Sequence, residues 1–324
     1  LLSCGENQLA TLNVSQNNAL VILDCFGNQL TSLDVSQNIA LNYLICGNNQ
    51  LTSLDVSQNT ALIHLICGHN QLANLDVSQN NALAWLDCHE NQLTSLDVSQ
   101  STNLIDLLCE NNQLMSLDLS NSPALDLLQC DDNQLTTLDI SQNIALTHLD
   151  CQYNQLTSLD FSQNPALELL HCGQNQLTTL DVTQNSALTW LFCGGNQITT
   201  LEVTQNMVLE ALFCSNNNLI CLNTANGNNT NFWAFVPDNN PGLTCIEVDN
   251  AAWSTDNWLE IDSQMYFSED CNSDCTSSVT ELTTSKKIMQ ILDLMGRETS
   301  FKPNTPLIYV YDDGSIEKVF SVDY

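Results

Sequence analysis

Eleven cysteines divide most of this 324-residue chain into equal intervals. They stand 21 residues apart, at Cys4, Cys25, Cys46, Cys67, Cys88, Cys109, Cys130, Cys151, Cys172, Cys193 and Cys214. A fixed period of this size is the signature of a repeat architecture, in which each unit packs only on its neighbours. The period therefore predicts one elongated solenoid of about eleven repeats over residues 1–218, instead of the two ordinary domains that length alone indicates.

Each repeat contains two similar half-turns. Residues 20–30, LVILDCFGNQL, follow the pattern L-x-x-L-x-L-x-x-N-x-L with Cys25 in the third leucine place, and residues 30–38 repeat the phrase with Val35 there. Strand alternation directs Leu23 and Cys25 inward and Asp24 outward. We therefore expect a mainly β, helix-poor solenoid, with a short parallel strand on its concave side and a second strand or extended segment opposite.

The periodic thiols are interpreted as a ladder that fills the core, because cysteine is small and readily buried. Equivalent Cβ atoms on in-register strands stand about 4.8 Å apart and point the same way, whereas a disulfide needs converging Cβ atoms about 3.8 Å apart. A straight column does not offer the converging ligands of a zinc site. A reactive thiolate needs positive neighbours, and residues 1–278 contain no Lys or Arg.

The unit LTSLDVSQNxALxxLxCxxNQ resembles the 21-residue cysteine-ladder repeats of the internalin-J-like leucine-rich-repeat proteins, over about residues 1–218. The resemblance implies a bacterial surface protein that binds host or environmental macromolecules on its concave face. Similar repeats occur in secreted proteins of Bacteroidota. Repeat similarity does not carry over the identity of the ligand.

The charge balance excludes several kinds of partner. The chain has 37 acidic and 5 basic residues, and every basic residue lies at Lys286 or later. A surface without cations cannot follow nucleic acid or an anionic membrane, but it attracts cations and basic partners. No apolar run reaches about 18 residues, so we expect no membrane span, and we expect a monomer. Because Leu1 lies within a repeat, we expect an N-terminal cap and any signal peptide to precede it.

Function is expected where the repeats differ, and two strand columns vary most. Their large side chains should face the concave surface, where exposed aromatic residues mark interaction sites. Covering by a C-terminal extension or a neighbouring molecule is the alternative. The candidate ligand-binding residues are Tyr43, His64, Trp85, His148, His171, Trp190, Phe192 and Phe213.

Carboxylates between the two aromatic patches are candidate calcium ligands, with a solvated acidic rim as the alternative. They are Asp87, Glu90, Asp106, Glu110, Asp131 and Asp132. The constant column that contains Asp34 and Asp55 is expected to accept local hydrogen bonds, or else to hold a calcium ladder. His69, His89 and Glu90 form a loose transition-metal motif. Apart from possible Ca²⁺ binding, we expect no cofactor.

The sequence contains no strong catalytic constellation, and we expect no enzymatic activity. It has no G-x-S-x-G, no glycine-rich phosphate loop and no H-E-x-x-H.

After Cys214 the period breaks, and residues 219–275 are interpreted as a C-terminal cap of the kind that solenoids require. The cap resembles the segment ending in F-S-E-D-C that closes such repeats in secreted Bacteroidota proteins. Its four cysteines allow two disulfides in three pairings. Cys245–Cys271 is the pair we favour, and Cys221 is alternatively a plain core residue.

Residues 276–324 form a polar linker and a segment of short strands with an Asp-Gly hairpin turn at Asp312–Gly314. The runs DLMGRE (293–298) and PLIYVY (306–311), with Lys287, Gly314 and Lys318, resemble the sorting domain of the type IX secretion system. That resemblance implies a Bacteroidota source, export to the cell surface or medium, and recognition of residues 279–324 by the secretion machinery. An ordinary β-sandwich tail is the alternative.

Together these features predict a secreted or cell-surface, adhesin-like protein that binds a protein or glycan on its concave face. An ice- or surface-binding solenoid is one alternative, because Thr31, Thr52, Thr94, Thr136, Thr157, Thr178 and Thr199 form a column of hydroxyls. An accessory module of a larger secreted enzyme is the other.

Overall fold

The computed structural model describes residues 1–271, 288–292, 299, 306–311 and 316–320. The chain divides into two compact units, Leu1–Cys275 and Thr276–Tyr324. The first unit is a helix-poor, parallel-β solenoid of about 13 turns, which confirms the predicted fold class. Among the described residues, no helix is both long and apolar enough to cross a membrane.

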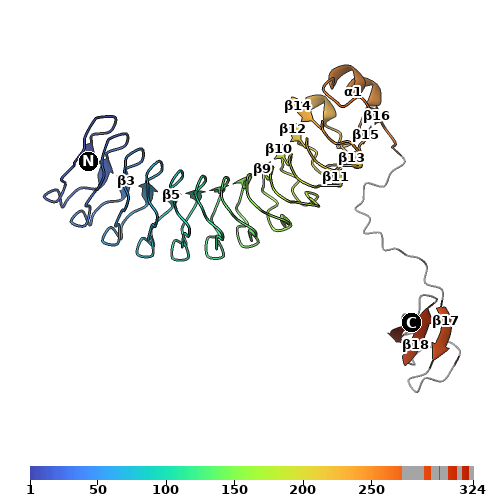
Figure 1. Cartoon of the computed structure of the whole chain (residues 1–324), viewed down its shortest axis with the longest axis horizontal. Helices are drawn as coiled ribbons and strands as arrows, with labels where there is room; N and C mark the ends of the chain where they lie inside the picture. The colour runs from blue at the N-terminus through green and yellow to red at the C-terminus, as the bar shows by residue number, and fades with distance from the viewer. Residues whose placement is uncertain (272–287, 293–298, 300–305, 312–315, 321–324) are drawn as a thin grey trace. The chain divides into compact units, whose positions relative to one another are not determined.

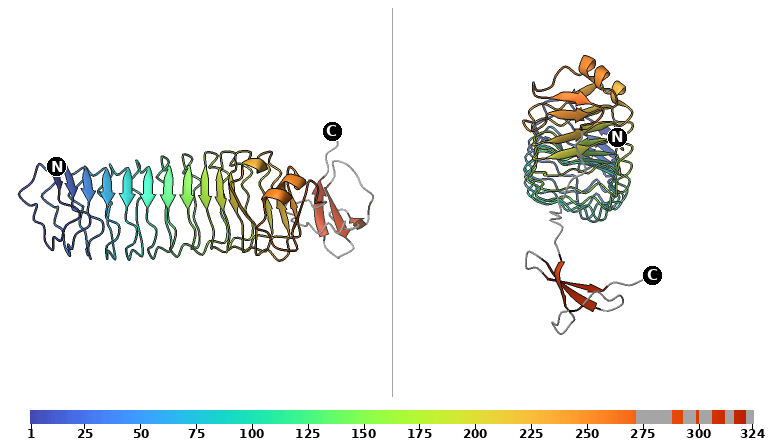
Figure 2. Two further views of the ribbon diagram at one scale, coloured as in Figure 1. Left: turned by 90° about the horizontal axis from the view of Figure 1, so that it is seen from above. Right: turned by 90° about the vertical axis from the view of Figure 1, so that its right-hand side faces the viewer.

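A twelve-stranded parallel sheet lines the concave side of this unit (Figure 1), with its strands side by side in one row (Figure 2, left). From β1 to β12 every pair is in register, so a residue in one strand lies beside the residue 21 positions later, as Tyr43 lies beside His64. The strands are β1 (Leu2–Ser3), β2 (Ile22–Asp24), β3 (Tyr43–Ile45), β4 (His64–Ile66), β5 (Trp85–Asp87), β6 (Asp106–Leu108), β7 (Leu127–Gln129), β8 (His148–Asp150), β9 (Leu169–His171), β10 (Trp190–Phe192), β12 (Ala211–Phe213) and β14 (Ala234–Val236).

A second parallel sheet begins only near the C-terminal end of the solenoid. Its strands are β11 (Thr200–Glu202), β13 (Cys221–Asn223), β15 (Cys245–Glu247) and β16 (Tyr266–Ser268). In earlier turns this side is extended chain that ends in a local turn, where the Ser36 amide donates to Asp34 Oδ1 at 2.9 Å. A hydrogen bond from the Ser36 side chain, followed by this one from its amide, lowers the pKa of Asp34. The constant aspartate column is thus engaged in local hydrogen bonds.

The solenoid continues beyond residue 218, although its period changes. Ala234 pairs with Ala211, 23 residues earlier instead of 21, because the insertion that precedes β14 includes the 3-10 helix η1 (Asn229–Asn231). Helix α1 (Ala251–Asn257) follows β15, and Asn250 caps it by accepting from the Trp253 amide at 2.9 Å. Residues 219–271 therefore add turns to both sheets.

Aromatic packing and disulfides hold this last part together. The Trp258 ring is buried between Phe235 and Phe267, at centroid distances of 4.2 and 5.6 Å. Cys245 and Cys271, the pair favoured from the sequence, form a disulfide. Cys221 is also disulfide-bonded, so its interpretation as a plain core residue is wrong, and Cys275 lies outside the described residues.

The core of the regular turns contains the cysteine ladder. From Cys25 to Cys214 every thiol on the period is buried, as is the leucine at the centre of each three-residue strand. Burial raises the pKa of these thiols, to about 12 for Cys193, because a thiolate would lose its hydration there. The thiols thus fill the core as small apolar groups.

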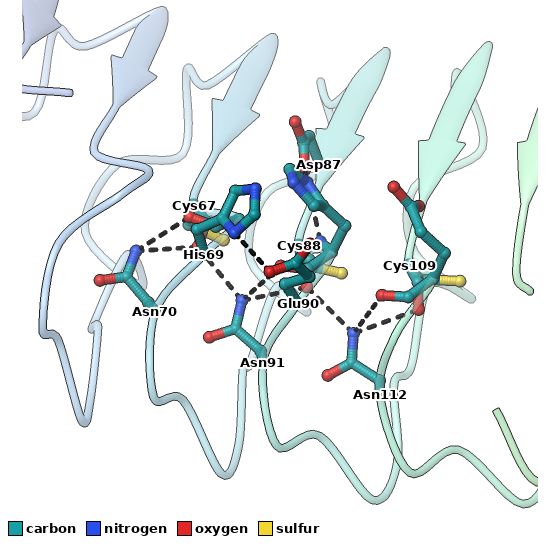
Figure 3. A network of polar contacts seen from close by, with 12 residues as sticks. Cys67, His69, Asn70, Asp87, Cys88, Glu90, Asn91, Cys109 and Asn112 are labelled. Atoms are coloured by element: carbon teal, nitrogen blue, oxygen red, sulfur yellow. Dashed lines mark hydrogen bonds and ion pairs between the residues drawn. The ribbon is translucent and has the colours of Figure 1, made fainter. Parts of the chain in front are cut away.

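Two columns of buried asparagines bind successive turns together. In the column drawn in Figure 3, Asn112 Nδ2 donates to the carbonyl oxygens of Cys88 and Cys109, both at 3.1 Å. Its Oδ1 accepts from the Leu93 amide at 2.9 Å. In the second column, Asn59 Nδ2 donates to the Asn38 carbonyl oxygen of the preceding turn at 2.9 Å. Side-chain amides therefore satisfy backbone groups that the short strands leave unpaired.

The second unit contains a three-stranded antiparallel sheet of β17 (Ile288–Leu292), β18 (Pro306–Tyr311) and β19 (Ile316–Phe320). Val310 pairs with Ile316 across the predicted Asp-Gly turn. The turn residues, Lys287 and residues 293–298 of the proposed sorting signal lie outside the described residues.

Candidate functional site

The first and third residues of the strands form two columns on the concave face, mostly half-exposed, because the central leucine points into the core. The in-register pairing stacks equivalent side chains from turn to turn. All eight predicted ligand-binding residues lie in these two columns. Whether they bind a ligand stays a prediction.

The first aromatic group consists of Tyr43, His64 and Trp85, from β3, β4 and β5. The Tyr43 and His64 rings stack with centroids 4.5 Å apart and an interplanar angle of 15°. The His64 and Trp85 rings follow at 6.0 Å and 22°. The three partly buried rings form one continuous stack along the sheet.

The second aromatic group consists of His171, Trp190, Phe192, Phe213 and Trp233. Phe192 stacks on Phe213 at 4.5 Å and 9°, and His171 meets the edge of Phe192 at 3.9 Å. Trp190 packs at right angles to Trp233 at 6.0 Å. Trp190 is 38% exposed and Trp233 is 60% exposed, so this group offers the larger accessible apolar surface.

Sequence reasoning missed Trp233 because the insertion before β14 shifts the period by two residues. The signal that could have found it is the run FWAFV, in which Phe235 occupies the buried central place beside Leu212. This register puts Trp233 just before the strand, at the edge of the aromatic surface. His148, by contrast, has no ring contact with either group among the described residues, and its Nδ1 lies 2.7 Å from Thr147 Oγ1.

The six predicted calcium ligands lie at different places on their turns. Asp106 opens β6 and Asp87 closes β5, whereas Glu110 and Asp131 each follow a ladder cysteine. Glu90 and Asp132 occupy a loop column with left-handed backbone, at φ 45° and 48°. Among the described residues these carboxylates do not form a group of three with ligand atoms within 4.8 Å. Calcium binding stays a prediction.

An acidic strip that contains Asp87, Glu110 and Asp131 lies beside the strands, and some of its carboxyl groups have raised pKa values. Burial, followed by repulsion from Asp150 and Glu110, raises the pKa of Asp131 to about 7. Burial also raises the pKa of Glu110, and that of Asp106 on the other flank. Asp131 therefore carries less negative charge near neutral pH than an ordinary aspartate.

Three histidines are paired with carboxylates at this edge of the sheet. His171 Nδ1 lies 2.9 Å from Asp150 Oδ2, and His89 Nδ1 lies 2.5 Å from Asp87 Oδ1. His69 and Glu90 point toward one another from successive turns (Figure 3), with His69 Nδ1 2.6 Å from Glu90 Oε2. The loose His69, His89 and Glu90 motif of the sequence is thus a compact cluster, with ligand atoms within 4.8 Å of one another.

Comparison with known proteins agrees with this architecture. A family model described as leucine-rich repeats (2 copies) matches residues 144–184. No curated protein matches the sequence. The functional domain of InlJ from Listeria monocytogenes, described as including a cysteine ladder, is 29% identical, with a TM-score of 0.69 over 99% of this chain and 85% of that chain.

Two more distant structures share the fold alone. A leucine-rich-repeat protein of Leptospira interrogans is 24% identical, with a TM-score of 0.63 over 81% of this chain and 70% of that one. YopM, a leucine-rich effector protein from Yersinia pestis, is 21% identical, with a TM-score of 0.56 over 81% and 76%. The described solenoid is therefore similar in fold to the cysteine-ladder domain of InlJ, and residues 144–184 match the leucine-rich-repeat model.

Proposed function

We propose that this chain is a secreted or cell-surface, adhesin-like binding protein that holds a protein partner on its concave face and has no enzymatic activity. The observation that carries the proposal is the pair of aromatic groups on that face, stacked in register and open to solvent at Trp190 and Trp233. Leucine-rich-repeat solenoids use such extended concave surfaces for binding. Large aromatic side chains are the residues that most often dominate the energy of an interface.

The charge distribution favours a protein partner over a neutral glycan. The solenoid has no Lys or Arg, and the acidic strip containing Asp87, Glu110 and Asp131 runs beside the strands between the two aromatic groups. A partner that covers both aromatic groups would cross this strip. A basic protein surface complements it electrostatically, which raises the association rate and excludes acidic competitors. A glycan ligand is the other outcome of the test below.

Export is the second part of the proposal. The resemblance of residues 279–324 to a type IX secretion signal supports recognition of the second unit by that machinery and release or display outside the cell. Fusing residues 276–324 to a reporter in a Bacteroidota host with and without a functional type IX system tests this part. Secretion that does not depend on the system would contradict it.

Binding is tested by screening the full chain against arrays of surface proteins and glycans, with Ca²⁺ and with chelator. We expect a basic protein among the hits. A hit lost in chelator makes the acidic strip part of the site, and an indifferent hit assigns it to the aromatic groups. Hits only among glycans would contradict the protein partner.

The anchor residues are tested with the hit from that screen. Trp85→Ala and Trp190→Ala should each weaken binding about 30-fold, because a central aromatic anchor contributes about 2 kcal/mol or more. Tyr153→Asn is the matched control, since Tyr153 is an exposed aromatic residue in the loop column and belongs to neither aromatic group. Equal affinity of the three variants and the wild type would refute the anchor assignment.

The ice- or surface-binding alternative has one observation in its favour. All seven threonines of the predicted column are exposed. However, Ala73 and Met115 interrupt the column, so its longest unbroken run is the four turns from Thr136 to Thr199. A thermal-hysteresis measurement on the full chain tests this alternative, and activity there would displace the adhesin-like proposal.

A further inference from the structure

We propose that His69, His89 and Glu90 form a binding site for one divalent transition-metal ion of the Zn²⁺ class, between the turns that carry β4 and β5. The site lies beside the concave face and does not depend on the proposed partner. Among the described residues this is the one group of His, Cys, Asp and Glu side chains whose ligand atoms lie within 4.8 Å of one another.

Backbone hydrogen bonds between the two turns fix the positions of these three residues. The His69 amide donates to the His89 carbonyl oxygen at 2.9 Å, and the Asn70 amide donates to the Glu90 carbonyl oxygen at 3.2 Å. His69 and Glu90 occupy the same left-handed place in successive turns, at φ 50° and 45°. Their side chains therefore leave the loop in the same direction, one turn apart, and meet (Figure 3).

The donor set selects the class of metal. Two imidazoles and one carboxylate provide three ligands, and the fourth tetrahedral position stays open for water or a partner's side chain, as in open zinc sites. Imidazole suits Zn²⁺, Cu²⁺ and Ni²⁺, whereas Ca²⁺ requires six or more oxygen ligands. The 2.6 Å approach of His69 Nδ1 to Glu90 Oε2 shows that both atoms already converge.

Asp87 acts as a positioning residue for the second imidazole. Its carboxylate contacts His89 Nδ1 at 2.5 Å and is only 12% exposed. A carboxylate behind a histidine fixes the orientation of the ring and raises its basicity at metal sites. It leaves Nε2 of His89 as the atom for the ion.

The space for this pair exists because residue 68 is glycine. A Cβ atom at Gly68 would lie 2.3 Å from His89 Nδ1 and 2.8 Å from Asp87 Oδ1. Any other residue there would displace the imidazole. The His69 and Glu90 side chains are 45% and 49% exposed, so an ion can enter from solvent.

The experiment is Zn²⁺ titration of the untagged, chelator-treated full chain by calorimetry, in physiological salt with excess Ca²⁺ to saturate non-specific carboxylate sites. We expect one Zn²⁺ per chain. Co²⁺ should give visible d–d absorption without a sulfur charge-transfer band, because the ladder thiols are buried.

The variants use residues that occupy the same place in other turns, so that each fits the local backbone. His69→Asn matches Asn48, His89→Gln matches Gln152 and Glu90→Gln matches Gln174. Each should lower the Zn²⁺ affinity at least 10-fold, and Asp87→Asn should lower it about 10-fold. His148→Leu, which matches Leu127 and lies outside the cluster, is the control that should keep wild-type affinity.

Circular dichroism and thiol protection verify that each variant is folded before its affinity is measured. Zn²⁺ affinity unchanged in both His69→Asn and His89→Gln would overturn the site. A Co²⁺ spectrum with a sulfur band would also overturn it, by assigning the metal to cysteine.

Discussion

Replacing Asn112 with alanine isolates the energetic contribution of one rung of the asparagine ladder. Asn112 is buried, and its side chain makes hydrogen bonds to Cys88, Cys109, Glu110 and Leu93. The three carbonyl oxygens keep other donors, namely the side chains of Asn91 and Asn133 and the Glu90 amide. The Leu93 amide, however, loses the acceptor that the Asn112 side chain provides.

The cost follows from this difference. A buried donor without a partner costs about 1–3 kcal/mol, and each lost hydrogen bond whose acceptor keeps another donor adds about 1 kcal/mol or less. We therefore expect Asn112→Ala to lower the free energy of unfolding by about 2–4 kcal/mol. Because the defect lies mid-array and repeat arrays lose cooperativity easily, the urea transition should also broaden.

Urea unfolding followed by circular dichroism measures this free energy. Gln113→Ala is the matched control, because the adjacent side chain is exposed and its loss should change stability by about 0.5 kcal/mol or less. A loss below about 1 kcal/mol in Asn112→Ala, with an unchanged transition width, would refute the view that side-chain amides replace backbone pairing between turns.

Three further outcomes are expected. Asp131→Asn should raise the melting temperature at pH 8 but not at pH 4. The pKa of Asp131 is raised to about 7 in the folded state, so the stability it contributes when protonated is lost as pH rises through that value. Equal shifts of the melting temperature at both pH values would contradict this. Cys245→Ser should lower the free energy of unfolding by about 3 kcal/mol, since the disulfide closes 26 residues of chain; denaturant curves measure this loss, and an unchanged midpoint would argue against it. Ladder thiols such as Cys109 should react with iodoacetamide only on unfolding, because they are buried; mass spectrometry measures the labelling, and rapid native labelling would show the ladder is open.

The sequence predicted the solenoid because one period sets every buried position. Leu23, Cys25 and Val35 recur at fixed places, and the structure buries all of them. The period could not predict the turns after residue 218, since the insertion before Ala234 changes the spacing although the pairing continues. It also could not predict where the second sheet begins. Glu202, in the first strand of that sheet, accepts a hydrogen bond from the Thr204 hydroxyl. At the equivalent place of an earlier turn, Asp34 accepts from the Ser36 amide and forms a local turn.

The candidate sites were less predictable because they depend on contacts between turns. Residue columns indicated Tyr43, His64 and Trp85 as one group, and the structure stacks their rings. Column reasoning grouped six carboxylates because they lie on adjacent turns, but the structure distributes them among the strand edge and two loop positions. The His89–Asp87 contact depends on the room left by Gly68 in the preceding turn, which no pattern of charged residues reveals.

The left-handed loop column has a consequence for how such proteins diversify. From Asn48 to Asn216 this single place holds Asn, His, Glu, Asp, Tyr, Gln and Gly, at nearly the same backbone angles. The buried asparagine beside it bonds only to its own turn and the one before. Unequal recombination that duplicates whole 21-residue units would therefore preserve folding while changing which side chains stand next to one another. The two turns that carry His69 and Glu90 could be copied as one cassette, so that new sites arise by rearranging units instead of by rebuilding the scaffold.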